Sequence, residues 1–173
     1  MLTRLDWSAK TASFKNGCSP SSPGDSLEMR PLRLSDYHRG FLQLLGQLTL
    51  VGEVSFDEFK ERFSAMKQCR DTYYILVVED TGTKELIGCA TLLVEQKFIH
   101  SAGTRGRVED VVVHSEYRGR QLGKLLVETL TLLGKLVDCY KMSLECKPEN
   151  VKFYETFGYA PDGQLFMVQR YKD

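Results

Sequence analysis

The fold of this chain is decided by the stretch Val111-Val112-Val113-His114-Ser115-Glu116-Tyr117-Arg118-Gly119-Arg120-Gln121-Leu122-Gly123-Lys124, which predicts a strand, a tight basic turn and the start of a helix. Behind the turn, apolar residues recur at the spacing of one helix face: Leu122, Leu125, Leu126, Leu130, Leu133 and Val137. Such a junction directs backbone N–H groups and the positive end of a helix dipole at one spot, and the glycines allow close approach to the backbone. The turn therefore predicts a phosphate or pyrophosphate site.

Three cationic side chains surround this turn, and the motifs of two common phosphate sites are missing from the sequence. Arg118, Arg120 and Lys124 add positive charge, although the alternative remains that they are solvated residues of a loop before a core helix. The sequence has no GxxxxGK[ST] motif and no GxGxxG motif, which argues against a P-loop and against the usual dinucleotide fingerprint.

Composition indicates one globular domain without a bulk charge signal. The chain has 173 residues, of which 42% are hydrophobic, and 23 basic residues balance 23 acidic residues. Because net charge is zero, composition gives no case for a nucleic-acid or anionic-membrane partner. Five cysteines without a CxxC pair, scattered histidines and the lack of a long apolar run predict a cytoplasmic protein without a metal site or transmembrane segment.

Hydrophobic periodicity and turn signals predict alternating strands and helices after a flexible arm at residues 1–26. A capping box at Ser55 and Glu58 predicts a helix start, and Gly158 fits a left-handed helix end. The expected elements are strand 27–34, helices 37–48 and 55–66, strands 73–79, 85–96 and 107–113, the long helix behind the basic turn, strand 141–146, helix 150–157 and strand 166–171. This order predicts an α/β (α+β) fold in one domain, residues 27–173.

The turn Arg118-Gly119-Arg120-Gln121-Leu122-Gly123 resembles the [QR]-x-x-G-x-[GA] turn of the GNAT superfamily of N-acetyltransferases, except that Gln121 replaces the first glycine. Five further blocks, in the right order, are similar to the glucosamine 6-phosphate N-acetyltransferase family, from about residue 27 to 170. They are residues 47–52 (QLTLVG), 95–100 (EQKFIH), 108–113 (VEDVVV), 139–141 (CYK) and 150–155 (NVKFYE).

This resemblance implies the GNAT fold, a mixed and mostly antiparallel central sheet flanked by helices. It also implies transfer of the acetyl group of acetyl-CoA to the amine of D-glucosamine 6-phosphate, which gives CoA and N-acetyl-D-glucosamine 6-phosphate for UDP-N-acetylglucosamine biosynthesis. By resemblance, the enzyme is a homodimer and needs no metal. The sequence leaves two alternatives: an acetyltransferase for another small amine or a protein, and a non-catalytic acyl-CoA-binding module.

The acetyl-CoA site is expected along the strand, the turn and the helix start. The diphosphate would contact the amides of 119–124, and the pantetheine arm would run beside 111–113 where that strand splays from 141–146. An amide in 111–113 would then donate to the thioester oxygen. The expected residues are Val111, Val112, Val113, Arg118, Gly119, Arg120, Gln121, Leu122, Gly123, Lys124, Glu145, Asn150 and Tyr154.

Four residues are candidates for proton transfer and leaving-group stabilisation: Glu109, Asp110, Glu145 and Tyr154. Glu109 and Asp110 are consecutive, so they point to opposite faces of a regular strand and share a pocket only if the strand is bulged. No single base is assigned, because proton loss through water or a backbone carbonyl is equally consistent with the sequence. By resemblance, Tyr154 protonates or hydrogen-bonds the leaving thiolate, unless its ring only packs beneath a helix, and Asn150 is either a helix cap or a cofactor contact.

The sugar phosphate requires cations, and the resemblance supplies four: Lys97, His100, Lys141 and Arg170. In the family, the terminal strand contributes to the neighbouring subunit, so Arg170 would act across the dimer. Thr49 would bind the sugar or its phosphate, or else cap a helix end. The expected acceptor residues are Thr49, Lys97, Phe98, Ile99, His100, Glu109, Asp110, Val111, Tyr140, Lys141 and Arg170.

Overall fold

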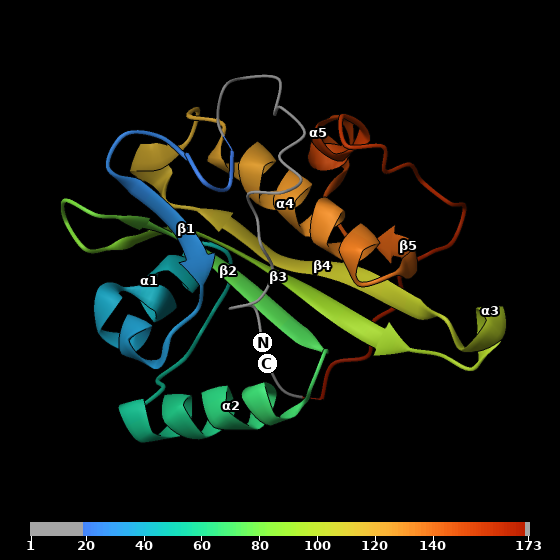
Figure 1. Ribbon diagram of the computed structural model, residues 1–173, viewed down its shortest axis with the longest axis horizontal. Helices are drawn as coiled ribbons and strands as arrows, with labels where there is room; N and C mark the ends of the chain where they lie inside the picture. Colours follow the sequence, from blue (N-terminus) through green and yellow to red (C-terminus); the bar gives the residue numbers. More distant parts are fainter. Residues whose placement is uncertain (1–18, 172–173) are drawn as a thin grey trace.

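A five-stranded sheet forms the centre of the computed structural model, which describes residues 19–171 (Figure 1). The strands lie in chain order: β1 (Leu27–Pro31), β2 (Tyr73–Asp80), β3 (Leu86–Gln96), β4 (Thr104–Val113) and β5 (Cys139–Ser143). Strands β1 to β4 pair antiparallel, whereas β5 pairs parallel to β4. The predicted mixed, mostly antiparallel sheet with flanking helices is confirmed.

Helices cover both faces of the sheet. The longest, α4 (Leu122–Leu136), lies on one face, and α1 (Phe41–Leu45) and α2 (Phe56–Gln68) lie on the other (Figure 1). A 3-10 helix at Leu34–Arg39 precedes α1, so the helix predicted over 37–48 is interrupted at Gly40, whose φ is 81°. The capping box at Ser55 and Glu58 is confirmed at the start of α2.

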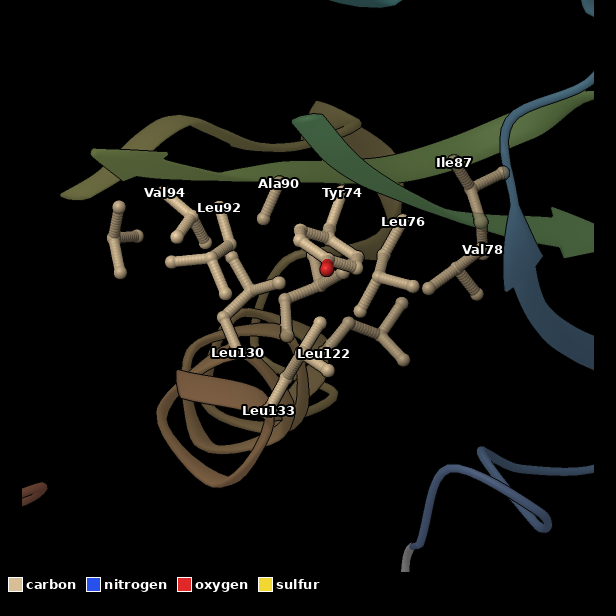
Figure 2. Packing of buried hydrophobic residues seen from close by; sticks show 12 residues of the cluster. Tyr74, Leu76, Val78, Ile87, Ala90, Leu92, Val94, Leu122, Leu130 and Leu133 are labelled. Carbon is tan, nitrogen blue, oxygen red and sulfur yellow. The ribbon is translucent and has the colours of Figure 1, made fainter. Parts of the chain in front are cut away.

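The apolar core forms two clusters, one on each face of the sheet. Figure 2 shows the first, in which side chains from β2 and β3 face Leu122, Leu130 and Leu133 of α4. The strand residues are Tyr74, Leu76, Val78, Ile87, Ala90, Leu92 and Val94. The second cluster joins Phe41 and Phe59 of the opposite helices to Val77, Leu86, Cys89 and Val112. This alternation along the strands reflects the two-residue period of β-structure. The sheet therefore holds α4 in a fixed position behind the basic turn.

A buried ion network fixes the edge of the sheet to the first helical segment. Arg30 of β1 donates to Asp36 at 2.8 Å and to Glu79 of β2 at 2.6 Å, and Arg39 also contacts Glu79. Burial disfavours the charge on Glu79, but the hydrogen bond and charge of Arg30, with Arg39 and Lys84, outweigh it and lower the pKa of Glu79. These paired charges satisfy one another away from solvent.

The prediction of a final strand at 166–171 is wrong. Positions 166–171 form no strand, and Leu165, Phe166 and Met167 are 91%, 65% and 88% exposed. The alternation of apolar residues is present, but a strand needs a partner for its backbone hydrogen bonds, and no described strand supplies one. The segment leaves the short helix α5 (Val151–Glu155) and runs along the outside of the molecule (Figure 1).

Shorter elements differ from the predictions at their boundaries. The predicted strand 141–146 becomes β5 and ends at Ser143, and the predicted helix 150–157 is a 3-10 turn at Pro148–Asn150 followed by α5. A short helix, α3 (Ile99–Ala102), stands before β4, with His100 and Ser101 in left-handed conformations. Residues 1–18 of the predicted arm lie outside the described residues. In the described range, no helix is both long and apolar enough to cross a membrane.

Candidate active site

The predicted junction of strand, turn and helix is present. Strand β4 leads into a 3-10 turn at Ser115–Tyr117, followed by the basic turn and α4. Gly119 has a φ of 79°, and Gln121, the N-terminal cap of α4, has a φ of 66°. Gln121 thus adopts the left-handed conformation that glycine accepts most readily. The departure from the glycine motif changes the side chain but leaves the backbone of the turn in place.

We expect the effect of a substitution at Gln121 to depend more on the backbone conformation that the new residue accepts than on the polarity of its side chain. Gln121→Val should lower the free energy of unfolding by about 1–2 kcal/mol, because a β-branched residue is strained at positive φ. Its KM for acetyl-CoA should rise several-fold, whereas Gln121→Gly should keep both values near wild type. Chemical denaturation and steady-state kinetics measure the two effects, and equal behaviour of the valine and glycine variants would contradict this explanation.

A cleft of about 380 Å³ opens beside this turn. Its lining joins the end of β4, the turn, the start of α4 and α5: Val113, Tyr117, Arg118, Gly119, Gln121, Leu122, Gly123, Lys124 and Phe153. The first N–H groups of α4 have no partner within the helix, so the cleft offers donors and the positive helix end together. A Cβ at Gly123 would stand between Phe153 and Val113, at 3.6 and 3.9 Å from their side chains, both of which line the cleft.

Seven of the predicted cofactor residues line this cleft, and six do not. The lining residues are Val113, Arg118, Gly119, Gln121, Leu122, Gly123 and Lys124, and the others are Val111, Val112, Arg120, Glu145, Asn150 and Tyr154. Val112 is 5% exposed and packs in the core cluster beneath α1. Sequence reasoning missed Tyr117 and Phe153, since an aromatic residue in a turn or short helix carries no specific signal of a ligand site.

Tyr117 connects the turn to the β2–β3 hairpin. Its hydroxyl donates to Asp80 Oδ2 at 2.7 Å, while Asp80 Oδ1 accepts from the Gly82 amide at 2.8 Å. The guanidinium of Arg120 lies over the Tyr117 ring, 4.7 Å from its centroid. The hydrogen bond to Asp80 raises the pKa of Tyr117, and the same bond, with backbone donors, lowers the pKa of Asp80. Tyr117 is thus held as a neutral donor beneath a cationic side chain of the turn.

Removal of this hydroxyl should weaken cofactor binding without stopping the reaction. Tyr117→Phe retains the ring beneath Arg120 but loses the hydrogen bond to the Asp80 carboxylate, which connects the turn to the hairpin. We expect the KM for acetyl-CoA to rise about three- to tenfold, with kcat and the KM for the acceptor within twofold of wild type. Steady-state kinetics with each substrate varied in turn measures this, and a loss confined to kcat would contradict it.

Strand β4 contains a bulge at the two adjacent acidic residues. Glu109 pairs with Thr91 and Val112 with Cys89, so two β4 residues, Asp110 and Val111, face one residue of β3. Asp110 has a φ of 53°. The bulge reverses the alternation of side chains, as Val108 packs toward α4 whereas Val112 packs on the opposite face. Glu109 and Asp110 could share a pocket only if the strand were bulged, and this bulge is present.

The surroundings of Asp110 favour its neutral form. Desolvation by the neighbouring protein raises the pKa of this carboxyl, and the charge of Glu109 raises it further, although the side chain reaches solvent. Cys89 is fully buried nearby, and burial raises the pKa of its thiol well above the ordinary range. Cys89 is therefore an inert core thiol.

Strands β4 and β5 separate just before the bulge. Their pairing ends at Arg107 and Ser143, although β4 continues to Val113. This confirms the expected splaying and leaves the backbone of β4 on that edge available to a further extended chain. Arg107 Nη2 contacts Glu109 at 2.9 Å and Glu145 at 2.5 Å, so two of the predicted catalytic carboxylates meet at the point where the strands part.

Tyr154 of α5 is half-buried, with ring contacts to Phe153 and Tyr159 at centroid distances of 5.0 and 6.3 Å. Within residues 19–171 its hydroxyl makes no hydrogen bond. Burial, with smaller effects from Cys146 and Tyr159, raises the pKa of Tyr154, so the phenol remains a donor at neutral pH. Asn150 makes no side-chain cap at the start of α5, so the capping role is not observed, and its contact with the cofactor stays a prediction.

Several predicted phosphate ligands gather at the end of the sheet where β4 and β5 begin. The His100 ring lies 4.1 Å from that of Tyr140, and Lys141 pairs with Arg105 in the strand register. Lys97 forms an ion pair with Glu95. Phe98 and Ile99 are 101% and 62% exposed.

The remaining candidates for acceptor binding, Arg170 and Thr49, have exposed side chains. Arg170 lies on the exposed C-terminal segment, and no contact within the described part of the chain brings it to the other cations. The amide of Thr49 donates to Leu45 O at 3.2 Å, and its side chain is exposed. Gln47 Oε1, which sequence reasoning did not assign, accepts from the Ser115 amide at 2.9 Å and connects the Thr49 segment to the start of the basic turn.

A metal site is not found in residues 19–171, since no three histidine, cysteine or acidic side chains are grouped as ligands.

Comparison with known proteins places this geometry in a family. Residues 34–159 match the acetyltransferase (GNAT) family. A probable glucosamine 6-phosphate N-acetyltransferase of Drosophila melanogaster is 49% identical over all of this chain and 80% of its own length. The glucosamine 6-phosphate N-acetyltransferase of Arabidopsis thaliana is 40% identical over 79% of this chain and 91% of its own length.

Solved structures agree with the sequence comparisons. The crystal structure of glucosamine-6-phosphate N-acetyltransferase from Arabidopsis thaliana superposes with a TM-score of 0.82 at 37% identity, and covers 86% of this chain and 100% of its own. An acetyltransferase of Trypanosoma brucei gives a TM-score of 0.76 at 31% identity and covers 83% of this chain.

Proposed function

The chain belongs to the acetyltransferase (GNAT) family, and from that premise we propose that it transfers the acetyl group of acetyl-CoA to the amine of D-glucosamine 6-phosphate. The products are CoA and N-acetyl-D-glucosamine 6-phosphate, which serves UDP-N-acetylglucosamine biosynthesis. The observation that carries the proposal is the surface along β4, whose splayed and bulged part leads to Val113 in the lining of the cleft at the N-terminus of α4.

The donor half of this surface fits acetyl-CoA. Backbone amides of 119–124, with the side chains of Arg118 and Lys124, supply donors and positive charge for a diphosphate. The free edge of β4 beyond Arg107 can accept the amide-bearing pantetheine arm as an added strand. An amide in 111–113 can then donate to the thioester oxygen as negative charge develops there.

The reaction requires two proton movements. The amine nitrogen attacks the thioester carbonyl carbon, the new C–N bond forms as the C–S bond breaks, the nitrogen loses a proton and the sulfur gains one. Glu109, Asp110 and Glu145 are the carboxylates near the splay, and each can orient the amine or accept its proton directly or through water. Tyr154, a neutral phenol, can donate to the leaving sulfur.

The acceptor phosphate is assigned to the cationic end of the sheet. Lys97, His100 and Lys141 lie on α3 and the neighbouring strand ends, and Tyr140 packs on the His100 ring. The exposed backbone and side chains of Phe98, Ile99 and Thr49 complete the candidate sugar contacts. A phosphate on these cations would direct the sugar amine along β4 toward the splay.

We assign Arg170 to the active site of a partner subunit in a homodimer. The C-terminal segment presents Leu165, Phe166, Met167 and Tyr171 to solvent in this chain, and such a run of apolar residues is suited to addition to another sheet. In the dimer, Arg170 would complete the phosphate site in trans.

Mixing two inactive variants tests that assignment. If Arg170→Ala and Tyr154→Phe damage different sites, subunit exchange should restore roughly a quarter of the wild-type activity, because half the dimers are mixed and each has one intact site. Activity of the mixture and exchange of differently tagged subunits are measured together. Exchange without recovery would place Arg170 in the same site as its own Tyr154.

Thiol release from acetyl-CoA tests the proposed reaction directly. The full chain is assayed with D-glucosamine 6-phosphate, glucosamine and spermidine in parallel. Release with the phosphorylated sugar alone is expected. Release with spermidine alone would retain the family but overturn the substrate, and saturable CoA binding without release in any assay would favour a binding module. The proposed compartment is the cytoplasm, which cell fractionation tests.

A further inference from the structure

Arg107 occupies the fork between β4 and β5. It is the last β4 residue paired with β5, opposite Ser143, and beyond it β4 continues alone through the bulge. Its side chain is 24% exposed, so the guanidinium lies partly covered beside the opening. Neither the GNAT turn nor the blocks shared with the acetyltransferase family assign this residue a role.

The guanidinium of Arg107 brings together two carboxylates from opposite sides of the fork. Its Nε and Nη2 each lie 2.9 Å from Glu109 Oε1, and Nη2 also donates to Glu145 Oε1 at 2.5 Å. Glu109 belongs to β4, whereas Glu145 follows the end of β5. Since both oxygens contact the same nitrogen, the two carboxylates lie within a few ångströms of each other.

Without the guanidinium, this arrangement would be unstable. Two carboxylates at such a separation repel, and the segment after Ser143 that carries Glu145 has no strand pairing to hold it. A charge-assisted, two-pronged contact is stronger and more directional than a single neutral hydrogen bond. Arg107 therefore fixes the position of Glu145 relative to Glu109, and with it one wall of the opening.

The second oxygen of each carboxylate stays available. Within residues 19–171, Glu109 Oε2 and Glu145 Oε2 make no hydrogen bond, and 36% of each side chain is exposed. Together, the side chains of Arg107, Glu109 and Glu145 carry a net charge of −1. A primary amine, which has several donors and a positive charge when protonated, matches two acceptors held in that way.

We propose that Arg107 is a positioning residue, which holds Glu109 and Glu145 together at the β4–β5 fork so that their free oxygens can receive the acceptor amine. This inference rests on the proposed acetyl transfer. Arg107 acts through the carboxylates and does not itself contact the substrates.

Three variants of the full-length chain test the role of Arg107. Arg107→Gln removes the positive charge and the two-pronged guanidinium, whereas Arg107→Lys keeps the charge but has a single donor group. Arg33→Gln is the matched control, because Arg33 has a 3.9 Å ion pair with Glu28 on the exposed β1 edge. Thermal unfolding and kinetics with each substrate varied in turn are measured for all three.

Arg107→Gln should lower kcat about 30-fold and raise the KM for D-glucosamine 6-phosphate about fivefold, with the KM for acetyl-CoA unchanged within twofold. Arg107→Lys should recover kcat to about fivefold below wild type, and Arg33→Gln should match wild type. Because Glu145 depends on Arg107, Glu145→Gln should cost much less in the Arg107→Gln background than alone.

An unchanged kcat in a folded Arg107→Gln variant would overturn the inference, as would an equal rise in both KM values or full additivity with Glu145→Gln. If Arg107→Gln unfolds, Arg107→Lys and the double-mutant cycle built on it decide the question. A wild-type chain inactive with the phosphorylated sugar would instead overturn the proposed function, so the two failures are distinguishable.

Discussion

Gly123→Leu is expected to raise the KM for acetyl-CoA about 50-fold while the fold stays intact, whereas Gly123→Ala, which the GNAT turn motif allows at this position, should change it less than threefold. A Cβ at this position would stand 3.6 Å from Phe153 and 3.9 Å from Val113, which are ordinary contact distances, so the protein itself accommodates a methyl group. The longer leucine side chain would extend into the cleft at the N-terminus of α4, where it obstructs a diphosphate near the backbone. Overpacking of that kind costs about 2–3 kcal/mol.

Stability and acceptor kinetics provide the internal controls for this change. Leucine and alanine both have a higher helix propensity than glycine, so thermal unfolding of either variant should occur at the wild-type temperature or slightly above it. The KM for D-glucosamine 6-phosphate should remain within twofold, because the acceptor is assigned to the other end of β4. An unchanged KM for acetyl-CoA would show that the diphosphate does not bind in this cleft.

The central part of the fold could be predicted from sequence because its signals are local. The valine run of β4, the helical spacing of leucines in α4 and the capping box of α2 each depend on residues near one another in the chain. The basic turn was predictable for the same reason, and its cleft includes seven predicted cofactor residues. Gln121 was the only departure from the motif, and it keeps the left-handed backbone conformation there.

Features that depend on residues far apart in the chain were harder to predict from the sequence. The bulge at Asp110 appears only in the register between β3 and β4, and no residue type in the sequence marks it unambiguously. Arg107 carries no local signal of its role, because Glu145, one of its two partners, is 38 residues away. The alternation at 166–171 predicted a strand, but these residues pair with no strand of the described chain, and alternation alone does not specify a partner.

Tyr154→Phe is expected to lower kcat about 100-fold with little change in either KM. Loss of a positioned proton donor in the transition state reduces rates by about 10² to 10⁴, and the smaller value applies if the phenol only hydrogen-bonds the leaving sulfur. An ordinary tyrosine has a pKa of about 10 and an ordinary thiol about 8.5, so full transfer is uphill by about 2 kcal/mol. Burial raises the pKa of Tyr154 and makes full transfer still less favourable.

The raised pKa also predicts how the wild-type rate depends on pH. Tyr154 donates only while protonated, so loss of this donor should reduce kcat above pH 10 and not between pH 7 and 10. Tyr159→Phe is the matched control, because Tyr159 is also a partly buried tyrosine but donates to or accepts from Thr131 at 3.0 Å. A Tyr154→Phe variant with wild-type kcat, or an equal loss of kcat in Tyr159→Phe, would show that the ring of Tyr154 only packs beneath α5. A loss specific to Tyr154 would identify its hydroxyl as the group that stabilises the departing thiolate.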